Sequence, residues 1–236
     1  MKKYLLPICL VGLGSINFIS CYQDDEEELF NCEDLSISRH TTLTRSGMNE
    51  SIDFNNNKDI ERRNTIKRNK EYPKEENCCY LTVIVERWIS TKSDNYFANP
   101  NCQPNANDYY QQMKRQLQDA NPGWTPGEAL DGSAFMDFAE DLTYQSGNTT
   151  ANYFSDLVIF SNIETSASAY LSNNGNCEKV TAICVEKTGE PGHIAYVTKC
   201  NANEVSFKGY DFLGNNRYKM NVNGESGWSI VGVILK

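Results

Sequence analysis

The chain has 236 residues, 39% of them hydrophobic, and a formal net charge of −9 at pH 7. This acidic balance argues against nucleic acid as a partner, because phosphate binding requires clustered Lys and Arg. The one basic cluster, Arg62 to Lys70, lies in a polar stretch without aromatic residues and is better explained as a solvated linker.

The first 20 residues have the organisation of an export signal. Lys2 and Lys3 precede a mostly apolar run that is too short for a comfortable membrane span. The run ends in Phe18-Ile19-Ser20-Cys21, which resembles the lipoprotein cleavage site with Phe18 in place of the usual leucine. The acidic residues that follow resemble the tag of surface lipoproteins in Gram-negative bacteria. We therefore expect lipidation at Cys21 and anchoring to the outer membrane or cell surface; an ordinary secreted protein is the alternative.

Residues 21–72 show little apolar periodicity and are rich in Asn, Ser, Thr and charged residues. This composition predicts a polar tether with little tendency to order. The remainder, residues 73–236, is long enough for one domain with a single hydrophobic core.

The first half of this domain is predicted to be helical. Residues 79–89 are apolar on nearly every side, and their β-branched residues are also typical of a strand. The length of the run and Asn77 as a good N-cap favour a helix. The other elements expected here are helices over 107–120 and 133–142, and a strand within 153–161 followed by a short helix over 167–171.

The C-terminal third is rich in β-branched and aromatic residues instead. Runs typical of strands are separated by Gly, Pro and Asn, and they cover 179–185, 193–200, 204–210 and 228–235. Helices first and an antiparallel sheet second predict an α+β fold, with the N-terminal helices packed against the C-terminal sheet.

A cysteine and a histidine occupy the expected starts of a helix and a strand. Cys79 opens the helix over 79–89, and His193 opens the strand over 193–200; His40 is the only other histidine. Such partners meet in the fold although they lie far apart in the sequence. Because a helix N-terminus and a neighbouring imidazolium both stabilise a thiolate, the pair predicts a nucleophilic site.

This order of residues is similar to that of the papain-like cysteine peptidases. The resemblance covers about residues 73–236 and is closest to bacteriocin-processing and CHAP-type enzymes, through the strand Gly192-His193-Ile194-Ala195-Tyr196-Val197. It implies a papain-like fold and a peptide or protein substrate. It also implies roles for Cys79 as nucleophile, His193 as base and Asp211 as the group that orients His193.

Alternatives remain for each of these residues. Cys78 competes with Cys79 as the nucleophile, and the aromatic Tyr80 favours Cys79. Asp211 is equally explained as a turn residue. Trp228 is expected either to cover His193 or to pack in the core.

The chain departs from the family in the glutamine that usually precedes the cysteine and donates to the oxyanion. None lies between Gln23 and Gln103; Asn69 or Asn77 could take its place, whereas an ionised Glu75 would oppose a developing oxyanion. The alternative function is therefore a non-catalytic surface module that binds protein or glycan, for which the abundant Tyr, Asn and Trp are suited.

Seven cysteines follow Cys21, an odd number that leaves one thiol over if the others pair. This parity fits a catalytic cysteine with three disulfides, and partial pairing equally. The sequence has no C-x-x-C pair and no second histidine in the domain, so neither a metal site nor another cofactor is expected.

Overall fold

The computed structural model describes residues 17–18, 51–75, 78–128, 130–160, 166–173, 175–190, 192–208 and 219–236. The helices are α1 (Ser51–Lys70), α2 (Cys79–Ser90), α3 (Asp94–Ala98), α4 (Ala106–Ala120), α5 (Gly132–Ala139), α6 (Ala167–Ser172) and α7 (Asn176–Lys179). The strands are β1 (Asn17–Phe18), β2 (Leu130–Asp131), β3 (Thr143–Ser146), β4 (Thr149–Asn152), β5 (Asp156–Ile159), β6 (Val180–Lys187), β7 (His193–Cys200), β8 (Glu204–Lys208), β9 (Lys219–Asn221) and β10 (Trp228–Leu235).

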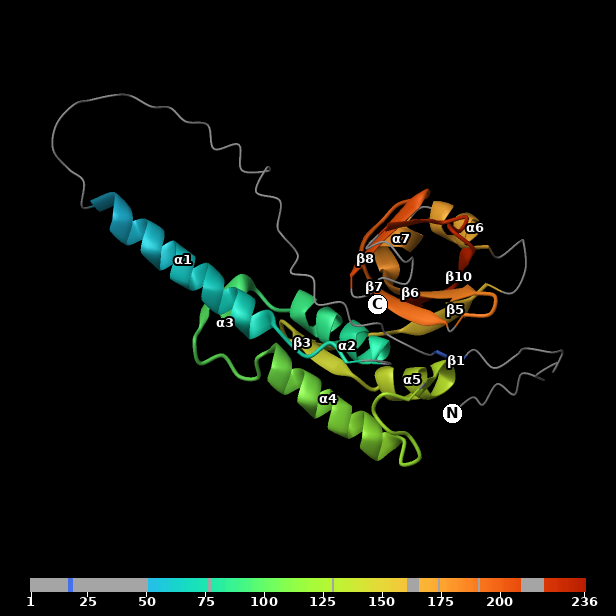
Figure 1. Ribbon diagram of the computed structural model, residues 1–236, viewed down its shortest axis with the longest axis horizontal. Helices are drawn as coiled ribbons and strands as arrows, with labels where there is room; N and C mark the ends of the chain where they lie inside the picture. The colour runs from blue at the N-terminus through green and yellow to red at the C-terminus, as the bar shows by residue number, and fades with distance from the viewer. Residues whose placement is uncertain are drawn as a thin grey trace, which may run out of the picture.

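The main sheet has six strands, every neighbouring pair antiparallel, in the order β5-β10-β6-β7-β8-β9 (Figure 1). Its two central strands, β10 and β6, come from the apolar runs at 228–235 and 179–185. The helices up to α5 precede it in the chain. The predicted α+β class is therefore confirmed, together with the four strands expected in the C-terminal third.

Different helices cover the two faces of this sheet. Helix α2 crosses the face formed by alternate residues of β7 and β8, where the Lys208 ammonium lies 3.0 Å from the Glu86 carboxylate of α2. Helix α6 packs against β10, and the Cys177–Cys200 disulfide ties α7 to β7 (Figure 1). Because both faces are covered, six consecutive residues of β6, from Val180 to Val185, are buried.

The helices predicted in the first half of the domain are confirmed. Helix α2 takes the α-helical form that its length favoured over a strand. Helix α4 begins with a capping box in which Asn105 and Asp108 exchange hydrogen bonds with each other's backbone. Its Tyr109 ring stacks on Trp88 of α2, with the ring centroids 4.5 Å apart, so the two helices share one core.

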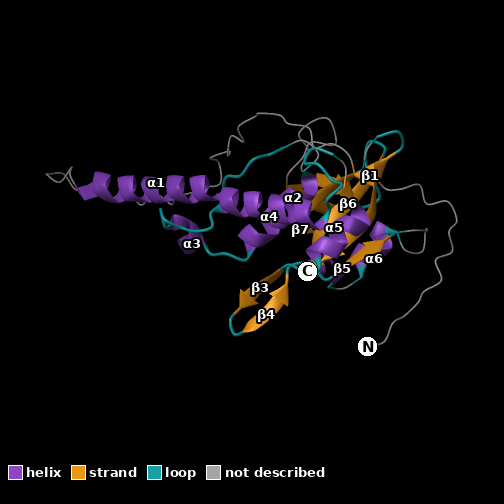
Figure 2. Ribbon diagram, turned by 90° about the horizontal axis from the view of Figure 1, so that it is seen from below, coloured by secondary structure: helices purple, strands orange, loops and turns teal. Residues whose placement is uncertain are grey.

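Helix α1 differs from the expectation of a tether with little order over 21–72. It runs for 20 residues, and Figure 2 shows its N-terminal part extending well away from the other elements. Its last turn is attached by polar contacts: the buried Asn69 amide donates to the backbone carbonyls of Phe97 and Asn99. Hydrophobic periodicity misses a helix of this kind because polar groups make its contacts with the domain.

The hairpin of β3 and β4 is a further element that the sequence did not predict. Its strands are four residues each, joined through Gly147, and mostly exposed. Figure 2 shows the hairpin standing apart from the main sheet. Without alternating apolar residues it has no period-two pattern, and the stacking of Tyr144 on Tyr153 at 4.8 Å holds its base.

Within the described ranges, no helix combines the length and apolar character needed to cross a membrane. Strand β1, which lies in the predicted export signal, pairs with β2 through Asn17 and Phe18. Cleavage before Cys21 would remove this pairing and leave β2 without that partner.

Candidate functional site

The first turn of α2 carries the two neighbouring cysteines. Cys78 is the N-cap and Cys79 the first helical residue, and the Cys78 side chain makes no capping hydrogen bond. The N-cap predicted at Asn77 is thus displaced by one position. Each cysteine is only 1% exposed. A reagent or substrate therefore reaches either thiol only when neighbouring side chains move.

The surroundings of Cys78 favour its neutral thiol. Burial raises its pKa, and hydrogen bonds with the Tyr110 hydroxyl and the Gly127 backbone oppose that rise. The Glu75 carboxylate raises the pKa further, although Glu75 is itself paired with the Lys114 ammonium. Because a protonated thiol is a poor nucleophile, these contacts suit a structural role for Cys78.

Cys79 has a neighbour that the sequence analysis did not single out. Cys184, in the middle of β6, is 1% exposed, and burial raises its pKa to about 12, with a further contribution from Cys79. The two thiols therefore come close where α2 packs on the sheet. No motif signals this proximity, because it arises from the register of β6 beneath the helix.

His193 begins β7, as predicted, and is 7% exposed. Its ring packs against Trp228 of β10 with the centroids 5.4 Å apart, and Trp228 is also part of the buried core, so the two alternatives for Trp228 are not separated. Burial lowers the pKa of His193 to about 4, and the nearby Glu190 carboxylate opposes this shift. The imidazole is consequently neutral at pH 7.

The strand register shows which way these side chains face. His193 pairs with Val185, and Ile194 pairs with Cys184. Since side chains alternate along a strand, Ile194 and Cys184 share the face that packs on α2, whereas His193 lies on the other face with Ala195.

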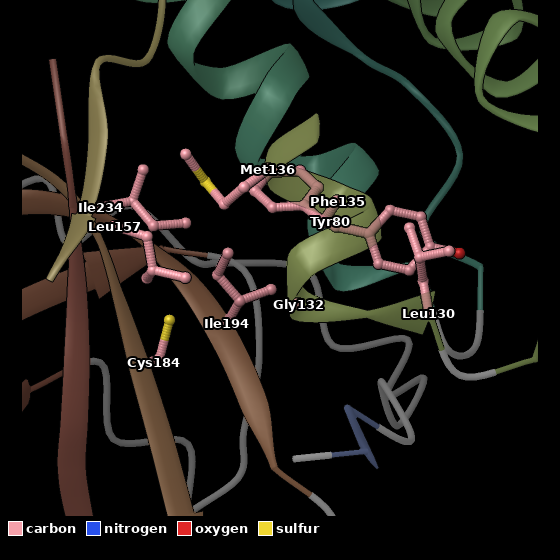
Figure 3. Close-up of a pocket in the computed structure, with 9 residues that line it drawn as sticks. All are labelled: Tyr80, Leu130, Gly132, Phe135, Met136, Leu157, Cys184, Ile194 and Ile234. Atoms are coloured by element: carbon pink, nitrogen blue, oxygen red, sulfur yellow. The ribbon is translucent and has the colours of Figure 1, made fainter. Parts of the chain in front are cut away.

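The starts of α2 and β7 nevertheless lie side by side. Figure 3 shows Tyr80, which follows Cys79, and Ile194, which follows His193, at the same small cavity of about 10 Å³. We name it the apolar cavity, and it is lined by Tyr80, Leu130, Gly132, Phe135, Met136, Leu157, Cys184, Ile194 and Ile234. Its size suits a single water molecule at most, and its lining offers hardly any polar group.

Several predicted site residues lie outside the described residues: Cys21, Asn77 and Asp211. Asn69 is described, and it does not take the place of the missing glutamine. Both of its recorded hydrogen bonds anchor α1 to the segment around α3. The concern that Glu75 opposes an oxyanion is reduced, because Lys114 neutralises that carboxylate.

One disulfide, Cys177–Cys200, is present among the described cysteines. The thiols of Cys78, Cys79, Cys102 and Cys184 are not in disulfides. Both candidate nucleophiles therefore exist as thiols, which the proposed chemistry requires. The described residues include no group of three His, Cys, Asp or Glu side chains able to hold a metal ion.

The arrangement thus brings a helix-start cysteine and a strand-start histidine to one corner of the fold, with Trp228 against the imidazole. Comparison with known proteins adds no family to this description. No protein-family model matches the chain, and neither a curated protein nor a solved structure similar to it was found.

Proposed function

We propose that the protein is a papain-like cysteine hydrolase that cleaves peptide or amide bonds, with Cys79 as nucleophile, His193 as base and Asp211 as the group that orients His193. One observation carries the proposal: the first residue of α2 and the first residue of β7 are a cysteine and a histidine, and their next neighbours share one cavity. The contact of Trp228 with His193 adds support.

In the proposed reaction, His193 removes the proton of the Cys79 thiol as the sulfur attacks the carbonyl carbon. The oxyanion that forms accepts hydrogen bonds from backbone N–H groups at the start of α2. His193 then gives the proton to the leaving amine, and the C–N bond breaks. Water, deprotonated by His193, hydrolyses the thioester and regenerates the thiol.

This chemistry requires an opening at the start of α2. Cys79 is 1% exposed, and His193 carries a pKa of about 4, too low for a stable thiolate–imidazolium pair in the closed arrangement. The free protein must therefore open, before substrate binds, to expose the thiol and bring the imidazole to it, and a thiol reagent meets this opened form.

The same burial favours a second candidate, a non-catalytic binding module of the cell surface. In that function Cys79, Cys184 and His193 are core residues. Both candidates share the anchor that we propose at Cys21. Incorporation of labelled palmitate by cells that express the wild type, and its loss in Cys21→Ser, would support the anchor; equal incorporation would refute it.

Iodoacetamide labelling of the purified protein at pH 6, with peptide mapping, distinguishes the two candidates. An ordinary thiol is almost wholly protonated at this pH, whereas an activated thiolate reacts rapidly. The hydrolase predicts fast labelling at Cys79 that slows in His193→Gln and is absent in Cys79→Ser. Cys78→Ser is the matched control, and it should label like the wild type.

Slow and equal labelling of Cys78 and Cys79, or none before denaturation, would reject the hydrolase and favour the binding module. Labelling after unfolding in urea verifies that all thiols are free to react. Retention of the helical circular dichroism spectrum in His193→Gln shows that a slower reaction does not arise from misfolding.

A further inference from the structure

The ends of β6 and β7 that lie far from His193 form a polar pocket. The ladder between the two strands runs from Val185↔His193 to Ala182↔Tyr196 and stops there. Beyond it the first residues of β6 and the last residues of β7 belong to strands but are not paired with each other. The two strands diverge, and the Cys177–Cys200 disulfide connects α7 across to the end of β7.

A cavity of about 280 Å³ occupies this divergence, and we name it the polar pocket. Its volume is near the lower end of the range of small-molecule sites. Its lining combines side chains of α2, α7, β6, β7 and the last residue of the chain: Arg87, Cys177, Glu178, Val180, Thr181, Tyr196, Val197, Thr198, Lys199, Cys200 and Lys236.

Cations dominate this lining although the chain as a whole is acidic. The side chains of Arg87, Lys199 and Lys236 carry three positive charges, against the side-chain carboxylate of Glu178 and the α-carboxylate of Lys236. Such a local excess of positive charge within a chain of net charge −9 raises the local concentration of small anions.

Arg87 is held in place while part of its guanidinium remains available. Its Nε donates to the Tyr153 carbonyl oxygen at 3.1 Å, and Nη1 donates to the Ser90 hydroxyl at 3.4 Å. The ring of Tyr144 lies 5.7 Å from the guanidinium carbon. Within the described part of the chain Nη2 has no hydrogen-bond partner, so this nitrogen can donate to a ligand without reorganisation of the side chain.

Thr181 carries a buried hydroxyl next to the polar pocket. Its side chain is 3% exposed, it lines the polar pocket, and its hydroxyl has no hydrogen-bond partner among the described residues. Burial of a hydroxyl without a partner is costly, and native proteins nearly always satisfy such a group. The hydroxyl oxygen is fully buried, so it does not open into the pocket and is not one of the groups that would contact a ligand.

From these features we infer that the polar pocket binds a small organic ligand through one oxyanion group, a carboxylate or a sulfate. The guanidinium of Arg87 and the ammonium of Lys199 bind the anionic oxygens. The site lies at the opposite end of the β6–β7 pair from Cys79 and does not depend on the proposed hydrolase.

Isothermal titration calorimetry of the full chain tests the inference. The probes are glucuronate with glucose as its neutral partner, N-acetylalanine with its amide, and inorganic sulfate. We expect binding of an anionic probe and none of its neutral partner. Binding of sulfate as strong as that of the organic acids would identify a free oxyanion as the ligand. Stronger binding of one organic acid would show which kind of organic group the pocket accepts beside the oxyanion.

Variants locate the binding in the polar pocket. Arg87→Gln should weaken the binding of the anionic probe about tenfold and Lys199→Gln about threefold, because charge-assisted hydrogen bonds are lost. Lys67→Gln, which removes an exposed cation of α1, is the matched control and should leave the affinity unchanged. Lys199 is exposed, so its substitution tests the site even where Arg87→Gln fails to fold.

The inference is overturned if no anionic probe binds at millimolar concentration. It is also overturned if Arg87→Gln and Lys199→Gln both leave the affinity unchanged, or if Lys67→Gln weakens it as much as they do.

Discussion

The two ends of the β6–β7 strand pair differ in nearly every physical property. At one end, His193 and Ile194 lie in a dry environment, and the apolar cavity measures only about 10 Å³. At the other end the strands separate around the polar pocket of about 280 Å³, where Lys199 is exposed. At one end of the strand pair, the proposed hydrolysis requires the closed structure to open. At the other end, the cations of the polar pocket can bind a ligand without such a change.

The comparison also shows how burial decides the state of ionisable groups. At the closed end burial lowers the pKa of His193 and raises that of Cys184, so both groups are neutral. At the open end the side chain of Lys199 is exposed to solvent. A nucleophilic pair therefore needs a conformational change, whereas an oxyanion site does not.

The largest expected effect concerns packing at the closed end. Ile194→Ala removes a side chain that is 3% exposed between the sheet and α2, and it should lower the free energy of unfolding by about 2–5 kcal/mol. Thr198→Ala, at an exposed position of the same strand, should change it by less than about 0.5 kcal/mol. Urea unfolding of both variants measures the difference, and equal effects would remove the contrast between the two ends.

The next effect is a dependence of stability on pH that arises from His193. Its pKa is about 4 in the folded protein and 6.5 for the ordinary side chain. The unfolded chain therefore takes up the proton first as the pH falls. The contribution of His193 to the free energy of unfolding is therefore complete above pH 6.5. Up to about 3 kcal/mol of this free energy is lost as the pH falls toward 4.

His193→Gln should remove this component. The measurement is the difference in unfolding free energy between wild type and variant at pH 7 and at pH 4.5. Glu190→Gln is the companion variant: because Glu190 raises the pKa of His193, its removal should slightly deepen the loss in acid. A wild-type-minus-variant difference that does not change with pH would show that the imidazole is accessible to protons in the folded state.

At the open end we expect a smaller effect, which is a gain in the free energy of unfolding instead of a loss. Thr181→Val replaces a buried hydroxyl that has no partner among the described residues by a methyl group of similar size. Without ligand, the variant should be as stable as the wild type or more stable by up to about 1 kcal/mol. Thermal unfolding checks this, and a clear loss of stability would mean that the hydroxyl is already satisfied in the free protein.

The smallest expected effect is that of Lys199→Gln on the ligand-free protein. The free energy of unfolding should change by less than about 0.5 kcal/mol, because the side chain is exposed and does not pack in the core. Thermal unfolding again provides the measurement. A large loss of unfolding free energy would show that Lys199 stabilises the open end, and it would count against a role of Lys199 in ligand binding.

Sequence reasoning succeeded where apolar residues recur with a regular period. The helices α2 and α4 and the strands β6, β7, β8 and β10 follow from such patterns. It failed for α1, because polar contacts such as those of Asn69 attach this helix to the domain. It also failed for the β3–β4 hairpin, because its strands are mostly exposed. A pattern of burial cannot reveal elements that bury little.

The sequence by itself determined the α+β order and the positions of Cys79 and His193 at the starts of a helix and a strand, because caps and periodicity are local properties. Only the tertiary structure decided that Cys184 lines a cavity with Tyr80, and that His193 and Cys184 belong to opposite faces of the sheet. It also decided that Arg87, Thr181 and Lys199 surround one pocket. These relations depend on strand register and on where the strands diverge, which non-local packing sets.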